Sequence, residues 1–575
     1  GFLAWTVHHE PATDPAQRRQ EWAKVGVVAG TWALLIGSGL GSTTLATIGL
    51  VSYVAAAAFA FTSGAGAFAL IALLVAAIGI TPYGFLYIRS AQSPMINEAA
   101  PATWAALLAV IRREQYPVRT PLDDPTVMHG PDNPGRSLTI ITLQLLNYLQ
   151  YFDWQWAKTL PSMLRAIVTA GFLSLGLRGM LHQRRTDRGA WWLFTLLFLV
   201  TGLGLVAYMN FRPGFSIGYD SFPNGEDHEV RERDYFFVVS FVTWGLWAGI
   251  GLGTLARDVL VRGGERARAL AYAVLALALV PVACNWAEAS RRGPDRELAA
   301  DFAYNLLNSV PPYGILFTYG DNDTFPLWWA QEVAGVRRDV TVVCLALAQT
   351  DWYMRQLRDN PTRDFDPATA PVPWAGRQAT RPDWPLHTMT DAEIKGASET
   401  PILLDRPTTV QFGPLRATFP ERTVFYPNDI VAMRIIQQNV GRRPIVWGVT
   451  SGRDFNGLAE HVVQQGIAFR LEVQKPDTTQ PGILQGGVGG NLIDVPLTEQ
   501  LAWETYRYGP LLHEDARYLE STSASIASTL SIPFSLLAYA ADVRGDTAGV
   551  VRQLEQAARI APSEALESAL TAYGR

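Results

Sequence analysis

The chain has 575 residues and a formal net charge of −5, and 49% of its residues are hydrophobic while only 17% are charged. This composition is too apolar for an ordinary soluble protein, and the acidic balance provides no basic surface for nucleic acid. The two cysteines, Cys284 and Cys344, are too few for a disulfide framework or a cysteine-based metal site. Hydrophobic residues are concentrated in the first half, so we expect a membrane domain followed by a soluble one.

Seven apolar segments in the first half are each close to the roughly 20 residues that a helix needs to cross a bilayer. The first two are joined by only two residues, so they form either two spans or a re-entrant pair. Together they predict a transmembrane domain over residues 1–290. The segments are 24–40, 43–61, 66–88, 161–180, 190–211, 235–257 and 267–286.

The positions of the arginines predict the orientation of these segments, because cytoplasmic loops are enriched in Lys and Arg. The loops after the fourth and sixth segments are basic, whereas the loop between the fifth and sixth has six acids and three arginines. We therefore expect the basic loops in the cytoplasm, and residues from about 287 onward outside it. The basic loops contain Arg178, Arg184, Arg185, Arg188, Arg257, Arg262, Arg266 and Arg268.

Residues 89–160 form a long outer loop in this topology. Within it, the stretch LTIITLQLLNYLQYFDWQW is rich in Tyr and Trp, which prefer the headgroup level of a membrane. We therefore predict an interfacial helix that lies on the outer leaflet, and the alternative is a helix that packs on the outer domain.

From about residue 295 the composition becomes that of a soluble protein, and expected strands alternate with expected helices. This alternation predicts an α/β domain over 291–495 with a mostly parallel sheet. We expect the first two strands to be neighbours, joined by a helix that begins near Thr324, and residues 360–425 to be irregular. The expected strands are 313–318, 340–346, 444–449 and 467–473, and the expected helices are 297–309, 325–334, 351–358 and 427–440.

Residues 496–575 are predicted to be helical. The stretch LLAYAADVRGDTAGVVRQLEQAARIAPSE resembles one tetratricopeptide hairpin. Because one repeat cannot bury its own apolar face, we expect this hairpin to cap the α/β domain.

The turn after the first expected strand is one candidate site. Asp321 and Asp323 follow that strand and begin a helix, with Asn322 and Thr324 beside them. Ligands of open α/β sheets bind at the carboxyl ends of strands, and these side chains would suit a divalent cation or a sugar hydroxyl. The same residue types are ordinary turn and N-cap residues, and we prefer that structural interpretation. Asp351, after the second strand, would lie on the same edge but is also a plausible N-cap, and we again prefer the structural interpretation.

A second candidate site is the group of charges at the outer end of the sixth segment. These charges either hold a lipid-linked phosphate, or act as acid and base near the membrane, or mark the start of a helix. We predict that residues 228–233 are not regular helix and that at least one arginine faces a cavity open to the outer membrane surface. The two glutamates would orient the arginines or meet the sugar. The residues are Glu229, Arg231, Glu232, Arg233 and Asp234.

Four motifs in the same order, RERDYFFVVSFVTWGLWAGIG, GDNDTFPLWWAQEVAGVRRDVTVV, TDWYMRQL and NVGRRPIVWGVT, resemble a bacterial multi-pass membrane family, domain of unknown function 2723. That family is similar to GT-C type glycosyltransferases, including the transmembrane protein 260-like O-mannosyltransferase. The resemblance covers residues 80–475 and implies a protein of the bacterial inner membrane. It also implies transfer of a sugar from a polyprenyl-phosphate donor to a protein or glycan acceptor on the outer face.

The resemblance further implies a catalytic acid in the outer loop after the first span of the family. Residue 1 is Gly, and the chain begins inside an apolar run, so we expect this loop upstream of Gly1. No residue of this chain is therefore assigned a catalytic role, and no metal site is assigned. The alternative is a non-enzymatic envelope protein, anchored in the lipid bilayer, whose outer domain binds a partner.

Overall fold

The computed structural model describes residues 14–114, 120–289, 296–452, 454–512, 519 and 521–574. The chain divides into two compact units, Gly1–Ala91 with Pro101–Ser290 and Gln92–Ala100 with Arg291–Arg575. Residues 92–100, called the strap below, belong to the second unit although their neighbours on both sides belong to the first.

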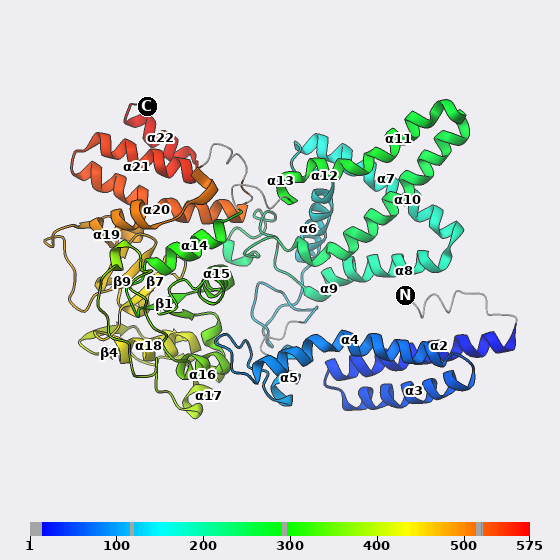
Figure 1. The fold of residues 1–575 in the computed structure, drawn as a ribbon, viewed down its shortest axis with the longest axis horizontal. Coiled ribbons are helices and arrows are strands. Elements are labelled where there is room, and N and C mark those ends of the chain that lie inside the picture. Colours follow the sequence, from blue (N-terminus) through cyan, green and yellow to red (C-terminus); the bar gives the residue numbers. More distant parts are fainter. Residues whose placement is uncertain are drawn as a thin grey trace. The chain divides into compact units, whose positions relative to one another are not determined.

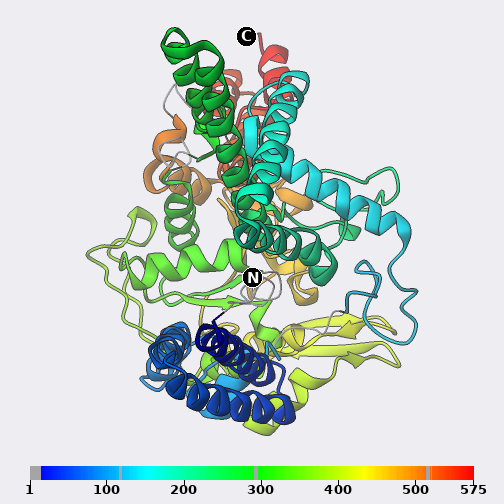
Figure 2. The ribbon, with the colours of Figure 1, turned by 90° about the vertical axis from the view of Figure 1, so that its right-hand side faces the viewer.

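The first unit begins with three helices that lie side by side (Figures 1 and 2). Asp14 and Ser42 cap the first two of them, each accepting a backbone N–H with its side chain. The first two helices pack closely because glycines stand where a Cβ would meet backbone, as at Gly37 against Ala46. The helices are α2 (Pro15–Gly39), α3 (Thr43–Thr62) and α4 (Gly66–Ser90).

Most of the remaining helices of the first unit share an aromatic core. Tyr148, Tyr151 and Trp156 of α6 are buried in it with Trp244 and Trp247 of α10. The aromatic stretch 138–156 thus turns most of its rings inward, and whether α6 also lies at a lipid interface stays a prediction. The helices are α5 (Trp104–Ile111), α6 (Leu138–Ala157), α7 (Ser162–Thr186), α8 (Arg188–Leu199), α9 (Leu205–Met209), α10 (Val238–Gly263), α11 (Arg268–Ala276), α12 (Val280–Cys284) and α13 (Trp286–Ala289).

Six helical stretches among the described residues are long and apolar enough to cross a membrane, judged by length and composition. Five lie in the first unit, where 6–17% of each apolar stretch is buried, and the sixth lies in the second unit with 56% buried. The first five fit a membrane protein, and the sixth packs within its own unit. They are Thr43–Thr62, Gly66–Ser90, Ser162–Thr186, Arg188–Met209, Asp234–Cys284 and Ser523–Val543.

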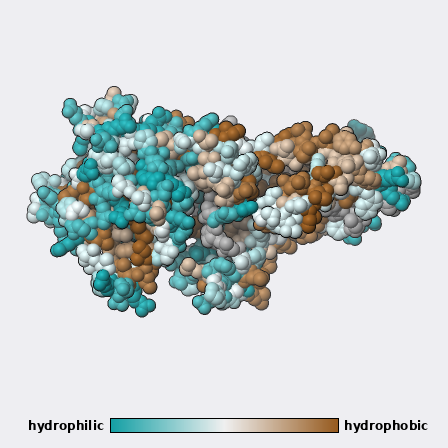
Figure 3. Space-filling model, turned by 90° about the horizontal axis from the view of Figure 1, so that it is seen from below, coloured by the Kyte–Doolittle hydropathy of each residue, from teal (hydrophilic) through white to brown (hydrophobic). Residues whose placement is uncertain are grey.

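These stretches cover six of the seven predicted spans, with the last two merged into Asp234–Cys284. The predicted span 24–40 lies in α2, which is not among the six, and α2 begins with several charged residues. The span count and the orientation therefore stay predictions. On the face shown in Figure 3, hydrophobic residues gather over the helical unit, while hydrophilic residues dominate the second unit.

The second unit contains a seven-stranded sheet with the order β10-β11-β8-β9-β7-β1-β2. The predicted pairing of the first two strands is confirmed, since Ile315 pairs with Thr341 in a parallel ladder. The predicted mostly parallel sheet is wrong, because three of its six pairings are antiparallel. The strands are β1 (Ile315–Thr318), β2 (Thr341–Cys344), β7 (Ile445–Gly448), β8 (Val462–Gln465), β9 (Ala468–Leu471), β10 (Ile483–Gln485) and β11 (Leu492–Asp494).

One of the antiparallel pairs has a local cause. Strands β8 and β9 are joined by only two residues, Gly466 and Ile467, and Gly466 has a φ of +57°. A connection this short can only reverse the chain, whereas a parallel pair needs a crossover of a dozen or more residues. The sheet is mixed, with parallel pairs on both sides of β1 and between β8 and β11.

Helices cover both faces of the sheet (Figure 1). Because side chains alternate along a strand, Leu316 faces one helical layer and Ile315 and Phe317 face the other. The first layer contains α14 (Leu298–Asn308), α15 (Asp321–Glu332), α19 (Val495–Gln500) and α20 (Ser521–Val543), and the second contains α16 (Asp351–Asp359), α17 (Asp391–Glu399) and α18 (Pro427–Asn439).

Residues 360–425 are more regular than predicted. A hairpin turns at Gly413, whose φ is +53°. Every second residue of its second strand is buried, namely Leu415, Ala417 and Phe419. The abundance of Pro and Thr in this stretch obscures that alternation in the sequence. Besides α17, the stretch contains β3 (Ile402–Leu403), β4 (Thr408–Phe412), β5 (Leu415–Phe419) and β6 (Val424–Phe425).

The chain ends in helices, as predicted. Gly545 lets the chain turn after α20, and Asp546 caps α21 by accepting the N–H of Gly549. Leu530 and Phe534 of α20 are buried against the sheet. The likeness of this hairpin to a tetratricopeptide repeat stays a prediction. The last helices are α21 (Thr547–Ile560) and α22 (Glu564–Ala572).

Candidate functional site

The charged segment before α10 has no regular helix over residues 228–233, as predicted. Glu229 is buried, and its carboxylate accepts the Nε–H of Arg233 at 2.8 Å and the backbone N–H of Arg212 at 3.1 Å. A second nitrogen of Arg233 lies 2.7 Å from the same carboxylate. Glu229 therefore orients Arg233, which is one of the roles expected for it.

Two other charges of this segment, Glu232 and Arg231, contact aromatic side chains. The hydroxyl of Tyr151 on α6 donates to Glu232 at 2.7 Å and accepts the backbone N–H of Arg233 at 3.0 Å. The guanidinium of Arg231 lies 5.8 Å from the centre of the Tyr235 ring. Asp234 begins a short 3-10 turn, Asp234–Phe237, that leads into α10. Whether an arginine faces a cavity stays a prediction.

His228 is a residue that the sequence did not single out. It is buried, with Nδ1 2.8 Å from the carbonyl of Gly214 and Nε2 2.7 Å from the carbonyl of Phe222. Its ring stacks on Tyr219 with the centroids 3.9 Å apart. A lone His in a loop carries no signal of such burial.

Of the two aspartates after β1, Asp323 is buried and Asp321 is exposed. Asp323 is buried and accepts the backbone N–H groups of Tyr319 and Gly320, both at 2.9 Å. It also accepts the Thr450 hydroxyl at 2.7 Å, which ties the end of β1 to the turn after β7. Asp323 thus has the structural role that we preferred.

The neighbours of Asp323 also differ in whether they are buried or exposed. The Thr324 hydroxyl bonds to that of Thr318 at 2.7 Å inside the fold, whereas Asp321 and Asn322 are exposed. Asp351 pairs with Arg355 one turn further along α16, at 2.6 Å. Among the described residues, no group of three or more His, Cys, Asp or Glu could hold a metal ion. A divalent cation at this edge stays a prediction.

The strap is held in the second unit by hydrogen bonds from α16 and the residue after it. The Asn360 side chain donates to the carbonyl of Met95 at 2.8 Å, and the backbone N–H of Asn97 donates to Gln356 at 2.9 Å. Ala99 and Ala100 pack on the core that also contains α16 and α18. A segment between α4 and α5 is therefore part of the α/β fold. No periodicity in the sequence marks it.

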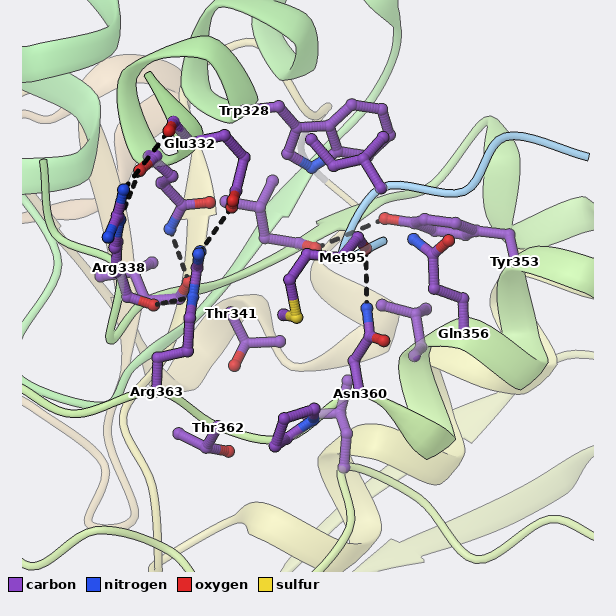
Figure 4. A pocket seen from close by; sticks show the side chains of 17 residues that line it. Met95, Trp328, Glu332, Arg338, Thr341, Tyr353, Gln356, Asn360, Thr362 and Arg363 are labelled. Carbon is purple, nitrogen blue, oxygen red and sulfur yellow. Dashed lines mark hydrogen bonds and ion pairs between the residues drawn. The ribbon is translucent and has the colours of Figure 1, made fainter. Parts of the chain in front are cut away.

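A cavity of about 70 Å³ remains between the strap and the residues around β2 (Figure 4). The side chain of Met95 extends into it, and Glu332 and Arg363 form a 2.6 Å ion pair in its wall. This volume has room for about two water molecules and is far below the several hundred Å³ of a ligand site. The cavity lies where the strap packs against the rest of the second unit, and β2 beside it is an edge strand.

The strap also brings a carboxylate to the turn after β1. Partial burial and the charge of Asp321 raise the pKa of Glu98. Glu98 is therefore more easily protonated when the strap is docked than when it is free. By linkage, docking is strongest at low pH and weakens as the pH rises through the raised pKa.

We predict that Glu98→Gln strengthens strap docking at pH 8, because the variant carries no charge facing Asp321. Hydrogen exchange of residues 92–100 should be slower in the variant than in the parent at pH 8, and equal in both at pH 4. Glu421→Gln, which changes an exposed carboxylate elsewhere in the unit, serves as the control. Faster exchange of the strap in Glu98→Gln would contradict the prediction.

At the start of β1, two buried arginines and one aspartate hold a turn. Tyr313 has a φ of +58°, a conformation that is uncommon for a residue other than glycine. Its N–H donates to Asp339 at 3.0 Å, and its carbonyl accepts the Nε–H of Arg443 at 2.9 Å. Asp339 also accepts two hydrogen bonds of 2.9 Å from Arg337. This arrangement fixes the turn from which β1 begins.

Residues 299–378 match the family model of TMEM260-associated domain 2. The matched region contains β1, α15, β2 and α16, and with them the turn of Asp321 and most of the wall beside the strap. No curated protein and no solved structure matches the chain significantly.

Proposed function

We propose that the chain is a GT-C-like membrane glycosyltransferase, or the C-terminal portion of one. It would move a sugar from a polyprenyl-phosphate donor to a protein or glycan acceptor on the outer face, as in protein O-mannosylation. The observation that carries the proposal is the TMEM260-associated domain at residues 299–378, in one chain with five exposed apolar helical stretches of spanning length.

In this proposal the exposed turn after β1 recognises the acceptor. The chain passes from β1 to β2 on one side and later to β7 on the other, and ligands bind at the carboxyl ends of strands where the order changes direction. Tyr319, Asp321 and Asn322 are exposed there. A phenol ring, a carboxylate and an amide are suited to contact the hydroxyl groups of a peptide or sugar.

The arginines before α10 would hold the donor phosphate at headgroup depth, because guanidinium groups bind phosphate in two parallel hydrogen bonds. Glu229 and Glu232 keep this segment against α6 through Arg233 and Tyr151. Arg231 is the arginine whose removal leaves those contacts in place.

A transfer assay tests the proposal. Membranes from cells that express the encoding gene should move labelled sugar from a polyprenyl-phosphate donor to acceptor, whereas membranes without the gene should not. Asp321→Ala should raise the KM for the acceptor severalfold with little change in kcat, and Arg231→Ala should raise the KM for the donor. Absence of transfer with every donor sugar tested would overturn the proposal.

The alternative is a non-enzymatic envelope protein whose outer unit binds a partner. One observation favours it, since Phe325 and Trp329 of α15 and Val333 directly after it are exposed at four-residue intervals. These residues recur every fourth position, as in helices that dock on a partner. This alternative would be supported if the chain shows no transfer activity but co-purifies with an envelope protein. The Trp329→Ala variant should then lose that protein.

Either function requires the second unit to lie outside the cytoplasm. The basic loops that contain Arg184 and Arg266 predict this location. Alkaline phosphatase fused after residue 292 should therefore be active, because it folds only outside the cytoplasm. An inactive phosphatase together with an active cytoplasmic reporter at the same position would contradict the topology.

A further inference from the structure

A groove of about 940 Å³ lies on the second unit where β7 begins, at the opposite end of this strand from the turn of Thr450. Four arginines and two carboxylates line it. Both carboxylates are committed to one arginine, since Glu472 and Asp494 lie 2.6 and 3.5 Å from nitrogens of Arg470. The other three arginines are Arg377, Arg442 and Arg443.

Arg443 is buried and incompletely bonded. It is 4% exposed, its Nε donates to Tyr313 and its Nη2 donates to the Thr341 hydroxyl at 2.8 Å. Its Nη1 has no hydrogen-bond partner in the described part of the chain. Burial lowers the pKa of Arg443 to about 10, against the opposing effect of the Asp339 carboxylate. A buried donor without an acceptor is energetically unfavourable.

Arg377 and Arg442 are exposed and held in place by aromatic rings. The guanidinium of Arg442 lies 3.7 Å from the centre of the Trp384 ring, and that of Arg377 lies 4.8 Å from the centre of the Trp374 ring. Within the described ranges, neither guanidinium forms an ion pair with a carboxylate. Stacking fixes the plane of a guanidinium and leaves its N–H groups free at the edge.

We propose that this groove binds a ligand that carries a phosphate or diphosphate group. Two arginines without carboxylate partners, Arg377 and Arg442, and the buried Arg443 line one groove. Guanidinium groups match the geometry of phosphate oxygens better than an ammonium does. The groove is larger than a phosphate alone and therefore has room for a group attached to the phosphate. This inference does not depend on the proposed transferase activity.

Calorimetry on the full chain in neutral-lipid nanodiscs tests the proposal, with inorganic diphosphate as one probe and vesicles that contain phosphatidic acid as the other. Arg442→Gln and Arg377→Gln should each weaken binding about tenfold or more, because a hydrogen bond to a charged group contributes about 1.5–3 kcal/mol. Arg416→Gln, an exposed arginine outside the groove, should leave the affinity unchanged.

The two probes distinguish the sources of phosphate. Binding of diphosphate that depends on Arg442 and Arg377 would support a soluble phosphate ester, and vesicle binding alone with the same dependence would support a lipid headgroup. Absence of binding to both probes would overturn the proposal. Equal affinity in the parent and both groove variants would overturn it as well, because the bound anion would then lie elsewhere.

Discussion

Replacing Asp339 by Asn is expected to destabilise the second unit by about 3–5 kcal/mol, the typical cost of removing one partner from a buried ion pair. The side chains of Asp339 and Arg337 are 2% and 5% exposed, so water cannot replace the lost carboxylate. Asp339 is also the nearby negative charge that favours the charged form of Arg443. The variant would leave two guanidinium groups buried together with no counterion.

The same substitution should release the turn before β1. Tyr313 keeps its positive φ because Asp339 accepts its N–H and Arg443 donates to its carbonyl. Hydrogen exchange of residues 313–318 should therefore accelerate more than exchange elsewhere in the unit. Asp364→Asn breaks an ion pair to Arg381 whose aspartate is 78% exposed, and it should cost about 0–1 kcal/mol. Equal effects of the two variants would contradict the buried-pair argument.

The parallel part of the sheet could be predicted because its signals are local. Strands β1, β2 and β7 are short apolar runs, and Gly320 and Asp323 mark the start of the crossover helix. The mixed character of the sheet could not be predicted. It depends on a two-residue turn at Gly466 and on β10 and β11, which are only three residues long and half-buried.

The candidate sites could likewise be predicted only where their residues lie close together in the sequence. The turn of Asp321 and Asp323 was found because both follow an apolar strand, and the structure separates a buried anchor from an exposed carboxylate. The strap, the turn at Tyr313 and the arginine groove join residues that are between 26 and 265 positions apart. Composition and periodicity carry no information on contacts at such separations, so only the structure shows these sites.

A second large effect is expected at Asp301, a buried aspartate on α14. Burial raises the pKa of Asp301 to about 6, with a further contribution from the charge of Glu297 and an opposing one from Arg507. Gly509 packs against its carboxylate, so water has little access to it. The ionised form of Asp301 is therefore less stable in the folded unit than in the unfolded chain.

The direction of the pH dependence follows from this shift. The folded pKa lies above the ordinary value of 3.8, so the contribution to stability is full below about pH 4 and is lost as the pH rises through about 6. Asp301→Asn keeps the shape of the side chain without the charge. It should stabilise α14 at pH 7.5 by about 1–3 kcal/mol, from roughly 1.4 kcal/mol per pKa unit, and should give no gain at pH 4.

Hydrogen exchange of residues 298–308 measures this gain without requiring the whole chain to unfold in one step. Glu297→Gln should give a smaller gain of the same sign, because it removes only the second cause of the pKa shift. Asp391→Asn, at a site where the aspartate is 72% exposed, should leave exchange in α14 unchanged at both pH values. The guanidinium of Arg507 lies 3.5 Å from the centre of the Tyr304 ring. If Asp301→Asn were less stable than the parent at pH 7.5, Asp301 would instead be a buried carboxylate that Arg507 stabilises.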